Sequence, residues 1–595
     1  MNQPMSDPKT GPRRDALAAA TIIAAWAAIV ALVGLGGDFA LNDDWAYAWT
    51  ARRLATTGEL RLLDWGAPSL ASHAAWGALV VRYFGPSYVL LRTGTLAFAG
   101  VGVLLLYAIG RRASLPPPAA ALLSGLTWLS PWCFGLSFTY MTDVPWLTLM
   151  LGAQLALLTA ERGQATRLLV AGTLLMLAAL SRQFAVMAAP AAVALVALDA
   201  RREGEAGWRR RAWRRAAVLL APLVVGFVAY QAWYTGAHGA TLANRSTLRR
   251  ILSTTPLDWA MNLSCVWHYA GLWVAPIALG CAAAGRLRGM TTPRFARIAA
   301  GLLLVFVAVD LLDSLIGAHG RLGLDRARQP LMPYLSNTVY VLGIGPLTIA
   351  DVYLGRSPFP HRPWAVGVAL TALSTFGGVY AATWLVAAGR RVAMRLAWLR
   401  ATAAPADAAA GEDVARDRAL MVLPGAAALH LAWVCGTGSL VFDRYVMVTM
   451  PAILWVALDG ARGAFGRRGA AAAVAVLALG ALFSVLGTRE YLGWNAARDG
   501  LVRALEARGV PGDAIDGGFE VNGPRRFEAW IASTHTLYSP GDNPWWVARP
   551  SRYRVVFDAT GPYPPGCRKI DSRSYPSLYP GEERAMAMLD CEPAP

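Results

Sequence analysis

Residues 15–36, DALAAATIIAAWAAIVALVGLG, form a long apolar run, and within a few residues the chain reads FALNDDWAYAW at 39–49. A run of this length matches the hydrocarbon core of a bilayer, because about 20 helical residues are needed to cross it. Asp43 and Asp44 follow the run closely, and ionised carboxylates are costly inside hydrocarbon. We therefore expect the run to cross a membrane and the acidic pair to lie at the water surface.

The composition of the whole chain points the same way. Of its 595 residues, 56% are hydrophobic and 15% are charged, whereas soluble proteins average about 25% charged residues. The mean hydropathy is +0.40, and apolar stretches of bilayer length recur along the chain. We therefore predict an all-α polytopic membrane protein in contact with the lipid bilayer. No small-x-small site leads from the first run into a soluble chain, so a cleaved signal peptide is not expected.

The net charge of +18 reflects topology rather than nucleic-acid binding. Arginines gather in short clusters between alternate apolar runs, which is the pattern of cytoplasmic loops. No nucleic-acid partner is therefore expected. The clusters are Arg13/Arg14, Arg111/Arg112, Arg201/Arg202 with Arg209 to Arg215, Arg286 to Arg297, Arg390 to Arg400, and Arg467/Arg468.

Thirteen apolar spans are predicted, and a cytoplasmic N-terminus places every arginine cluster on the cytoplasmic side. The odd number of spans puts the C-terminal tail outside. The Ala- and Arg-rich composition is typical of a bacterial inner (plasma) membrane protein, so the outer side would be the periplasm. The spans are 15–36, 88–110, 117–136, 144–160, 168–180, 184–200, 216–235, 263–284, 298–317, 364–388, 419–438, 445–461 and 469–487.

Residues 1–487 are expected to form the transmembrane domain, and the first periplasmic loop, 37–87, carries structure of its own. Residues 44–56 place Trp45 and Trp49 at helical spacing, which predicts an amphipathic helix along the membrane surface. The Ala/Arg-rich stretch 390–418 is expected to be a flexible cytoplasmic connector.

The composition changes towards the C-terminus, where residues 488–595 predict a small periplasmic soluble α/β domain. Residues 491–508 are expected to form an amphipathic helix and 553–557 a strand. Cys567 and Cys591 both fall in this domain, and an oxidising compartment would let them form a disulfide. The other four cysteines lie in or beside apolar runs, and no Cys/His spacing typical of a metal site occurs.

Ionisable residues collect at the predicted outer ends of the spans. A channel or a proton relay would place them at the bilayer midplane, so this distribution favours an enzyme whose pocket opens at the outer leaflet. A carboxylate there can act as a general base, and arginines can bind an anionic group. Two neighbouring carboxylates also raise the pKa of one of them by like-charge repulsion. The residues are Asp43, Asp44, Asp143, Arg182, Asp310, Asp313, Asp443, Arg444 and Tyr445.

The first loop resembles that of a known family. After the acidic pair come Tyr47, Arg52–Arg53, Thr57-Gly58-Glu59 and His73 with Trp76-Gly77-Ala78. This series is similar to the first outer loop of GT-C fold membrane glycosyltransferases, in particular the family-39-like group. That group includes the protein O-mannosyltransferases and the lipid A aminoarabinose and galacturonic acid transferases. The turn FTYMTDVP at 138–145 and the segment FDRYV at 442–446 resemble later motifs of the same group.

The resemblance implies a GT-C-like helical fold and inverting transfer of a sugar from a polyprenyl-phosphate donor to a hydroxyl acceptor on a glycan, lipid or protein, at the periplasmic face. It implies that a first-loop aspartate is the general base. Asp43 matches the family's Asp and Asp44 its Glu, and both stay candidates, with Asp143 as a further catalytic residue. The candidates for binding the donor phosphate are Arg182, Arg444 and Arg53, and those for the rest of the pocket are Tyr47, His73, Asp443 and Tyr445. Members of the fold differ in their use of a divalent metal, so a metal stays open and no other cofactor is expected.

Plainer roles exist for several of these residues. Asp43, Asp44 and Asp143 would each suit a helix N-terminus. Arg182 would suit a contact with lipid headgroups, and Arg444 would suit a pair with its neighbour Asp443. For the whole protein, the alternatives are a lipid-sugar transporter or flippase, which favours internal repeats and helices broken at the midplane, and a non-enzymatic membrane assembly protein.

Overall fold

The computed structural model describes residues 10–349, 364–400, 411–534 and 551–591, apart from short internal gaps and a longer one within 286–331, where only isolated positions are described. In these residues eight helices are long and apolar enough to cross a membrane, or nine if one bent pair counts as a single span. The predicted fold class, a polytopic helical protein with a small C-terminal domain, is confirmed.

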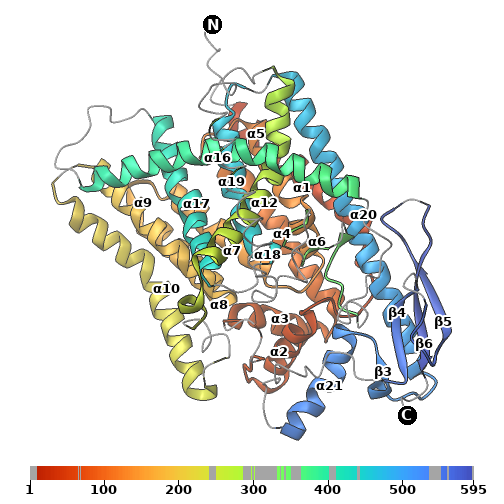
Figure 1. The fold of residues 1–595 in the computed structure, drawn as a ribbon. Coiled ribbons are helices and arrows are strands. Elements are labelled where there is room, and N and C mark those ends of the chain that lie inside the picture. Colours follow the sequence, from red (N-terminus) through yellow and green to blue (C-terminus); the bar gives the residue numbers. More distant parts are fainter. Residues whose placement is uncertain are drawn as a thin grey trace.

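The long helices form a bundle of apolar elements (Figure 1). They are α1 (Thr10–Val33), α4 (Tyr88–Arg112), α10 (Trp208–His238), α12 (Pro256–Ala283), α16 (Trp364–Arg400), α17 (Gly411–Gly436) and α20 (Arg467–Glu506). Shorter elements fill the bundle: α5 (Pro117–Trp128), α6 (Pro131–Ser137), α7 (Asp143–Thr159), η1 (Glu161–Gly163), α8 (Ala165–Ser181), η2 (Gln183–Ala188), α9 (Ala189–Arg202), α18 (Asp443–Val446), η5 (Met447–Thr449) and α19 (Met450–Gly460).

All predicted spans except 298–317 fall on these helices or on groups of short ones, and α7 and α8 are apolar helices shorter than the eight candidate membrane helices. The span 117–136 is broken into α5 and α6, which meet at 64°. The break has a local cause, because Pro131 cannot continue a helix and Ser130 caps the new one by accepting a hydrogen bond from the Cys133 backbone N–H at 3.3 Å. The span 298–317 lies outside the described residues, and so do Asp310 and Asp313.

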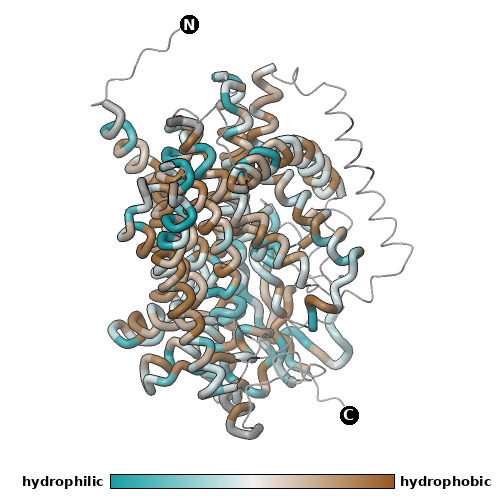
Figure 2. Tube along the Cα trace, turned by 90° about the vertical axis from the view of Figure 1, so that its left-hand side faces the viewer, coloured by the Kyte–Doolittle hydropathy of each residue, from teal (hydrophilic) through white to brown (hydrophobic). Residues whose placement is uncertain are grey.

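One end of the bundle carries a polar layer. It contains α2 (Asp44–Thr57), α3 (Ala71–Phe84) and α21 (Phe519–Thr534), with the C-terminal sheet beside them at the lower end of Figure 1. Figure 2 shows hydrophobic stretches along the middle of the bundle and hydrophilic ones near its ends. The helix predicted at 44–56 is thus present as α2. It is covered by protein, since Trp45 is buried edge-on against Phe519 and Phe527 at 5.7 and 5.6 Å.

The C-terminal sheet has four strands in the order β3 (Ile515–Asp516), β4 (Tyr553–Phe557), β6 (Arg584–Cys591), β5 (Cys567–Tyr575). β3 runs parallel to β4, and the other pairs are antiparallel. The strand predicted at 553–557 is therefore present. A small hairpin, β1 (Val339–Tyr340) with β2 (Gly343–Ile344), lies apart from this sheet.

Two predicted boundaries fall within helices. The limit at 487/488 falls inside α20, a single helix of 40 residues that runs from the apolar bundle into the C-terminal domain. The connector 390–418 is helical on both sides of the undescribed residues 401–410, because α16 continues to Arg400 and α17 begins at Gly411. Alanine, leucine and arginine are strong helix formers, so the Ala/Arg-rich composition favours helix over a flexible linker here.

A disulfide joins Cys567 and Cys591, which lie directly opposite each other on β5 and β6, 24 residues apart in sequence. Replacing both by serine is expected to lower the free energy of unfolding of the sheet by about 2–4 kcal/mol, because the cross-link restricts the unfolded chain. Limited proteolysis of the C-terminal domain in a urea series measures the change. Reductant should reproduce it in the wild type and have no effect on the double variant; sensitivity of that variant to reductant would contradict the assignment.

Candidate active site at the acidic first loop

Asp43 stands at the N-terminus of α2 and faces Arg444. Its Oδ2 accepts hydrogen bonds from Nη1 and Nη2 of Arg444 at 3.2 and 3.3 Å. Asp43 occupies the N-cap position, but its side chain accepts no capping hydrogen bond. The Arg444 side chain is 8% exposed and that of Asp43 is 16% exposed. The carboxylate is therefore directed at a cation in a largely enclosed site rather than used to start the helix.

A second ion pair joins Asp143 at the start of α7 to Arg182 at the junction of α8 and η2. Arg182 Nη1 donates to Asp143 Oδ1 at 2.8 Å, and its Nε donates to Thr142 Oγ1 at the same distance. Both side chains are buried, and Asp143 Oδ2 has no hydrogen-bond partner among the residues that the structure describes. Arg182 thus lies inside the protein and does not extend to a lipid headgroup.

The ring of Tyr445 brings the two ion pairs together. The Arg182 guanidinium lies 5.2 Å from the ring centroid and that of Arg444 lies 5.4 Å from it, distances at which a cation is attracted to an aromatic face. Tyr47, one turn after Asp43, is buried nearby. Burial raises the pKa of the Tyr47 phenol, with a further rise from Asp43.

Electrostatics show that the four charged groups form one cluster. Burial raises the pKa of Asp43 above the ordinary aspartate value of 3.8, the Arg444 guanidinium opposes that rise, and Asp143 and Arg182 contribute smaller effects of opposite sign. The structure thus brings Asp43, Asp143, Arg182 and Arg444 together, as their predicted place in one membrane layer implied. It pairs Arg444 with Asp43 rather than with Asp443.

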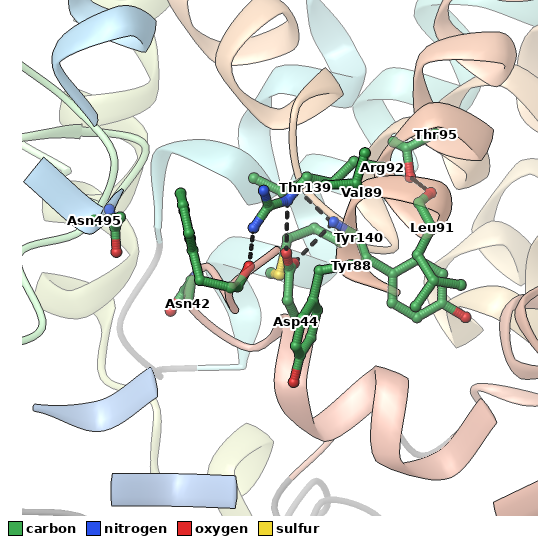
Figure 3. A network of polar contacts seen from close by, with 12 residues as sticks. Asn42, Asp44, Tyr88, Val89, Leu91, Arg92, Thr95, Thr139, Tyr140 and Asn495 are labelled. Atoms are coloured by element: carbon green, nitrogen blue, oxygen red, sulfur yellow. Dashed lines mark hydrogen bonds and ion pairs between the residues drawn. The ribbon is translucent and has the colours of Figure 1, made fainter. Parts of the chain in front are cut away.

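Asp44 makes different contacts, and Figure 3 shows its carboxylate beside Arg92 and Tyr140. Its Oδ1 accepts from the Tyr140 backbone N–H at 2.8 Å, and its Oδ2 lies 3.8 Å from Nε of Arg92. Arg92 also donates to the carbonyls of Gly37 and Phe39, so the pair ties α4 to the loop before α2. Burial raises the pKa of Asp44 to about 7, against the effect of Arg92. Asp44 has no exposed surface, and this geometry favours a structural role.

Asp443 serves as an anchor for the segment that precedes β1. Its carboxylate accepts from the backbone N–H groups of Thr338, Val339 and Arg444 at 2.7 to 3.1 Å, and from Trp132 Nε1 at 3.1 Å. Burial raises its pKa to about 6. Asp443, predicted as a pocket residue, therefore uses its carboxylate oxygens in hydrogen bonds that stabilise the fold. One of these hydrogen bonds holds the backbone of Arg444.

Arg53 is placed apart from the ion pairs, whereas His73 lies beside the cluster with its ring centroid 5.9 Å from that of Tyr47. Arg53 lies near the far end of α2, about 15 Å of helix from Asp43, where it pairs with Glu59 at 2.6 Å. His73 is stacked on Tyr140 with ring centroids 4.4 Å apart, and its Nε2 lies 3.2 Å from the Tyr140 carbonyl. Burial lowers the pKa of His73 to about 3, so it is neutral at physiological pH. The structure does not join Arg53 to Arg182 and Arg444.

A small apolar cavity of about 30 Å³ adjoins the ion pairs. It lies between α7, η2, α17 and α19 and is lined by Trp146, Met150, Phe184, His430, Val448 and Pro451, among others. Two of these touch the cluster directly: Trp146 lies 5.7 Å from the Arg182 guanidinium, and His430 Nε2 lies 2.8 Å from the Tyr445 carbonyl. The cavity thus places an apolar compartment beside two arginines.

Sequence reasoning missed Arg92 and His430. Each was visible as an ionisable residue inside a predicted span, 88–110 and 419–438, where such residues are expensive and have a specific partner. In the parts of the chain that the structure describes, no three His, Cys, Asp or Glu side chains are grouped to hold a metal ion. The metal therefore stays open.

Comparison with known proteins gives similarities in structure alone. No protein-family model and no curated protein matches the chain. Among solved structures, ArnT from Cupriavidus metallidurans in the apo state matches at 12% identity and a TM-score of 0.32, over 75% of this chain and 77% of that one. The same protein bound to undecaprenyl phosphate matches at 12% identity and a TM-score of 0.34, over 76% and 78%. The archaeal oligosaccharyltransferase AglB from Archaeoglobus fulgidus, in complex with an inhibitory peptide and a dolichol-phosphate, matches at 14% identity and a TM-score of 0.37, over 89% of this chain and 61% of that one. All three TM-scores are below 0.5, so these matches carry no argument about the family or the reaction of this chain.

Proposed function

We propose that this protein transfers a sugar from a polyprenyl-phosphate donor to a hydroxyl group of an acceptor, at the outer (periplasmic) face of the membrane and with inversion at the anomeric carbon. The observation that carries the proposal is the pair of ion pairs, Asp43–Arg444 and Asp143–Arg182, gathered around Tyr445 beside an apolar cavity. A carboxylate, two cations and an apolar compartment are the parts that this reaction requires.

Asp43 is the proposed general base. The acceptor hydroxyl gives its proton to the carboxylate, its oxygen attacks the anomeric carbon, and the bond from that carbon to the phosphate oxygen breaks. Polyprenyl phosphate leaves with the bonding electrons. Asp43 suits this role better than Asp44 because Asp43 is partly exposed beside the cations, whereas Asp44 is fully buried.

Arg182 and Arg444 are the proposed phosphate ligands. Guanidinium groups bind phosphate oxygens with strong, geometrically defined hydrogen bonds, and fixed cations stabilise the charge that develops on the leaving phosphate. In the structure Arg444 is paired with Asp43. A bound phosphate would compete for Arg444 and so release the Asp43 carboxylate to accept the proton. The base would then become available only when the donor is in place.

The apolar lining of this small cavity is the proposed contact surface for the first isoprene units of the lipid, and its side chains would have to move apart to admit them. The lining is aromatic and aliphatic, and it begins at Trp146, which lies against Arg182. When the phosphate of the lipid is bound by the arginines, the isoprenoid chain next to it would therefore lie against apolar side chains.

The proposal is tested with the full-length protein reconstituted in liposomes and a polyprenyl-phosphate sugar labelled in the sugar. Transfer of label to acceptors extracted from the native envelope, with release of polyprenyl phosphate, is the expected result, and Asp43→Asn should abolish it. Movement of intact labelled donor across the bilayer without transfer would instead identify a flippase. Full transfer by Asp43→Asn would refute Asp43 as the base.

The rate of transfer is expected to fall on the acid side of neutrality. The base acts only when deprotonated, and burial places the pKa of Asp43 above 3.8. The rate of transfer should therefore be at its maximum above the raised pKa of Asp43 and should be lost as the pH falls through that pKa. The pH profile of kcat/KM in liposomes measures this limb. A rate that stays constant down to pH 4 would contradict a buried aspartate base.

A further inference from the structure

The residue before Asp43 has an uncommon backbone conformation. Asn42 has a φ of 53°, in the left-handed region that residues with a Cβ occupy at a cost, although asparagine tolerates it better than most. This turn reverses the chain at the end of the first loop segment and directs Asp43 towards Arg444 (Figure 3 shows Asn42 beside Asp44). A conformation of this kind persists when its surroundings hold it in place.

A carboxylate of the C-terminal domain holds this turn. Glu520, in the first turn of α21, accepts a hydrogen bond from the Asn42 backbone N–H at 3.0 Å. Its carboxylate also accepts from Arg498 Nη1 at 2.8 Å and from the Thr348 hydroxyl. The Glu520 and Arg498 side chains are 1% and 2% exposed. A charged acceptor in such an enclosed place makes a strong, directed hydrogen bond.

The rest of α21 fixes the position of Glu520. Gly523, one turn later, lies so close to Trp45 of α2 that an added Cβ would come within 2.5 Å of the ring. Phe519 N–H donates to the Thr348 carbonyl at 2.9 Å, and Arg498 donates to Asn495 on the same α20 helix. Contacts with three separate segments of the chain thus position Glu520, in addition to its hydrogen bond with Asn42.

We infer that Glu520 is a positioning residue for transfer: it holds Asn42 in the left-handed conformation and thereby directs Asp43 at the site. The inference rests on the proposed role of Asp43 as base. It gives the C-terminal domain a part in catalysis through a contact 478 residues away in sequence. Loosening α21 would turn the base away from the acceptor and would also weaken the pair that Asp43 makes with Arg444.

A double-mutant cycle between Glu520 and Asn42 tests the inference. Glu520→Gln is expected to lower kcat about tenfold, since the charge-assisted contact is lost. The donor KM should not rise, because a displaced Asp43 competes less with the phosphate for Arg444. Glycine adopts positive φ freely. In an Asn42→Gly background, Glu520→Gln should therefore cost about threefold or less, because the turn then needs less support. Equal losses in both backgrounds would overturn the inference, because a merely structural role would give additive effects.

Glu506→Gln is the matched control. It breaks the Arg525–Glu506 pair of 2.8 Å between the same two helices, α20 and α21, without contacting Asn42, and kcat should stay within about twofold of the wild type. A tenfold loss in this control would overturn the inference. If Glu520→Gln does not accumulate, Asn42→Ala replaces it, with an expected tenfold fall in kcat; wild-type kcat there would overturn the inference. Transfer retained by Asp43→Asn would refute the proposed base. Wild-type kcat in Glu520→Gln, together with an inactive Asp43→Asn, would refute only the positioning role of Glu520.

Discussion

Asp43→Asn is expected to lower kcat for sugar transfer by about 10²–10⁴-fold, the usual contribution of a positioned general base. Asparagine keeps the size of the side chain and an oxygen that can accept from Arg444, but it cannot take a proton from the acceptor. The carboxylate is also partly exposed, so the fold should tolerate the change. Single-turnover transfer from labelled donor in liposomes, with thermal unfolding of the same preparation, measures both effects.

Asp44→Asn is the matched comparison and should behave differently. Its amide oxygen can still accept from the Tyr140 N–H, but Arg92, 1% exposed, would lose its only carboxylate partner within the described part of the chain. Breaking a buried ion pair costs about 3–5 kcal/mol. We therefore expect a lower melting temperature and lower abundance, with residual transfer in the molecules that fold. A stable but inactive Asp44→Asn beside an active Asp43→Asn would reverse the assignment.

The membrane layer of the site could be predicted from the sequence, whereas its pairings could not. Hydropathy assigns each residue a depth, so Asp43, Asp143, Arg182 and Arg444 were expected in one layer. The depth of a residue in the membrane does not determine which residues lie beside it in the same layer. Arg444 and Asp43 are 401 residues apart, and their contact depends on how α2 and α18 pack.

A pattern of two adjacent acids also could not predict that the side chains of Asp43 and Asp44 point in different directions. Asp43 precedes α2 and Asp44 is its first residue, so consecutive side chains leave the backbone in different directions. The signal that could have separated them is Arg92, the single charged residue in the run 88–110. A buried arginine requires a carboxylate, and Asp44 is the one that it meets.

The predicted domain boundary falls inside a helix because composition and backbone continuity are separate properties. The character of the chain changes near residue 488, but no proline stands between Arg467 and Glu506 to end the helix. α20 therefore leads from the bundle into the C-terminal domain without a break. The α21 helix of that domain packs onto α2, beside the first loop.

Arg444→Ala is expected to lower kcat for transfer by about 10²–10³-fold, as removal of a fixed donor from a site of developing charge does in other enzymes. The donor KM should also rise, because phosphate binding loses a cation. Arg444→Lys should recover only part of the loss, since a lysine ammonium cannot make the two-pronged contact of a guanidinium. Steady-state kinetics over a series of donor concentrations separate these effects.

A substitution of Arg444 is a clearer test than one of Arg182, because the two substitutions leave different carboxylates without their arginine. Without Arg182, the Asp143 carboxylate would stay buried with no cation at its Oδ1, so a loss of activity would be mixed with a loss of stability. Arg53→Ala provides the control: Arg53 is 39% exposed and pairs with Glu59 at the far end of α2, where an ion pair contributes about 1 kcal/mol at most. Its transfer rate should stay near that of the wild type. If Arg53→Ala lost as much activity as Arg444→Ala, the donor phosphate would have to bind along α2, and the cluster around Tyr445 would not be its site.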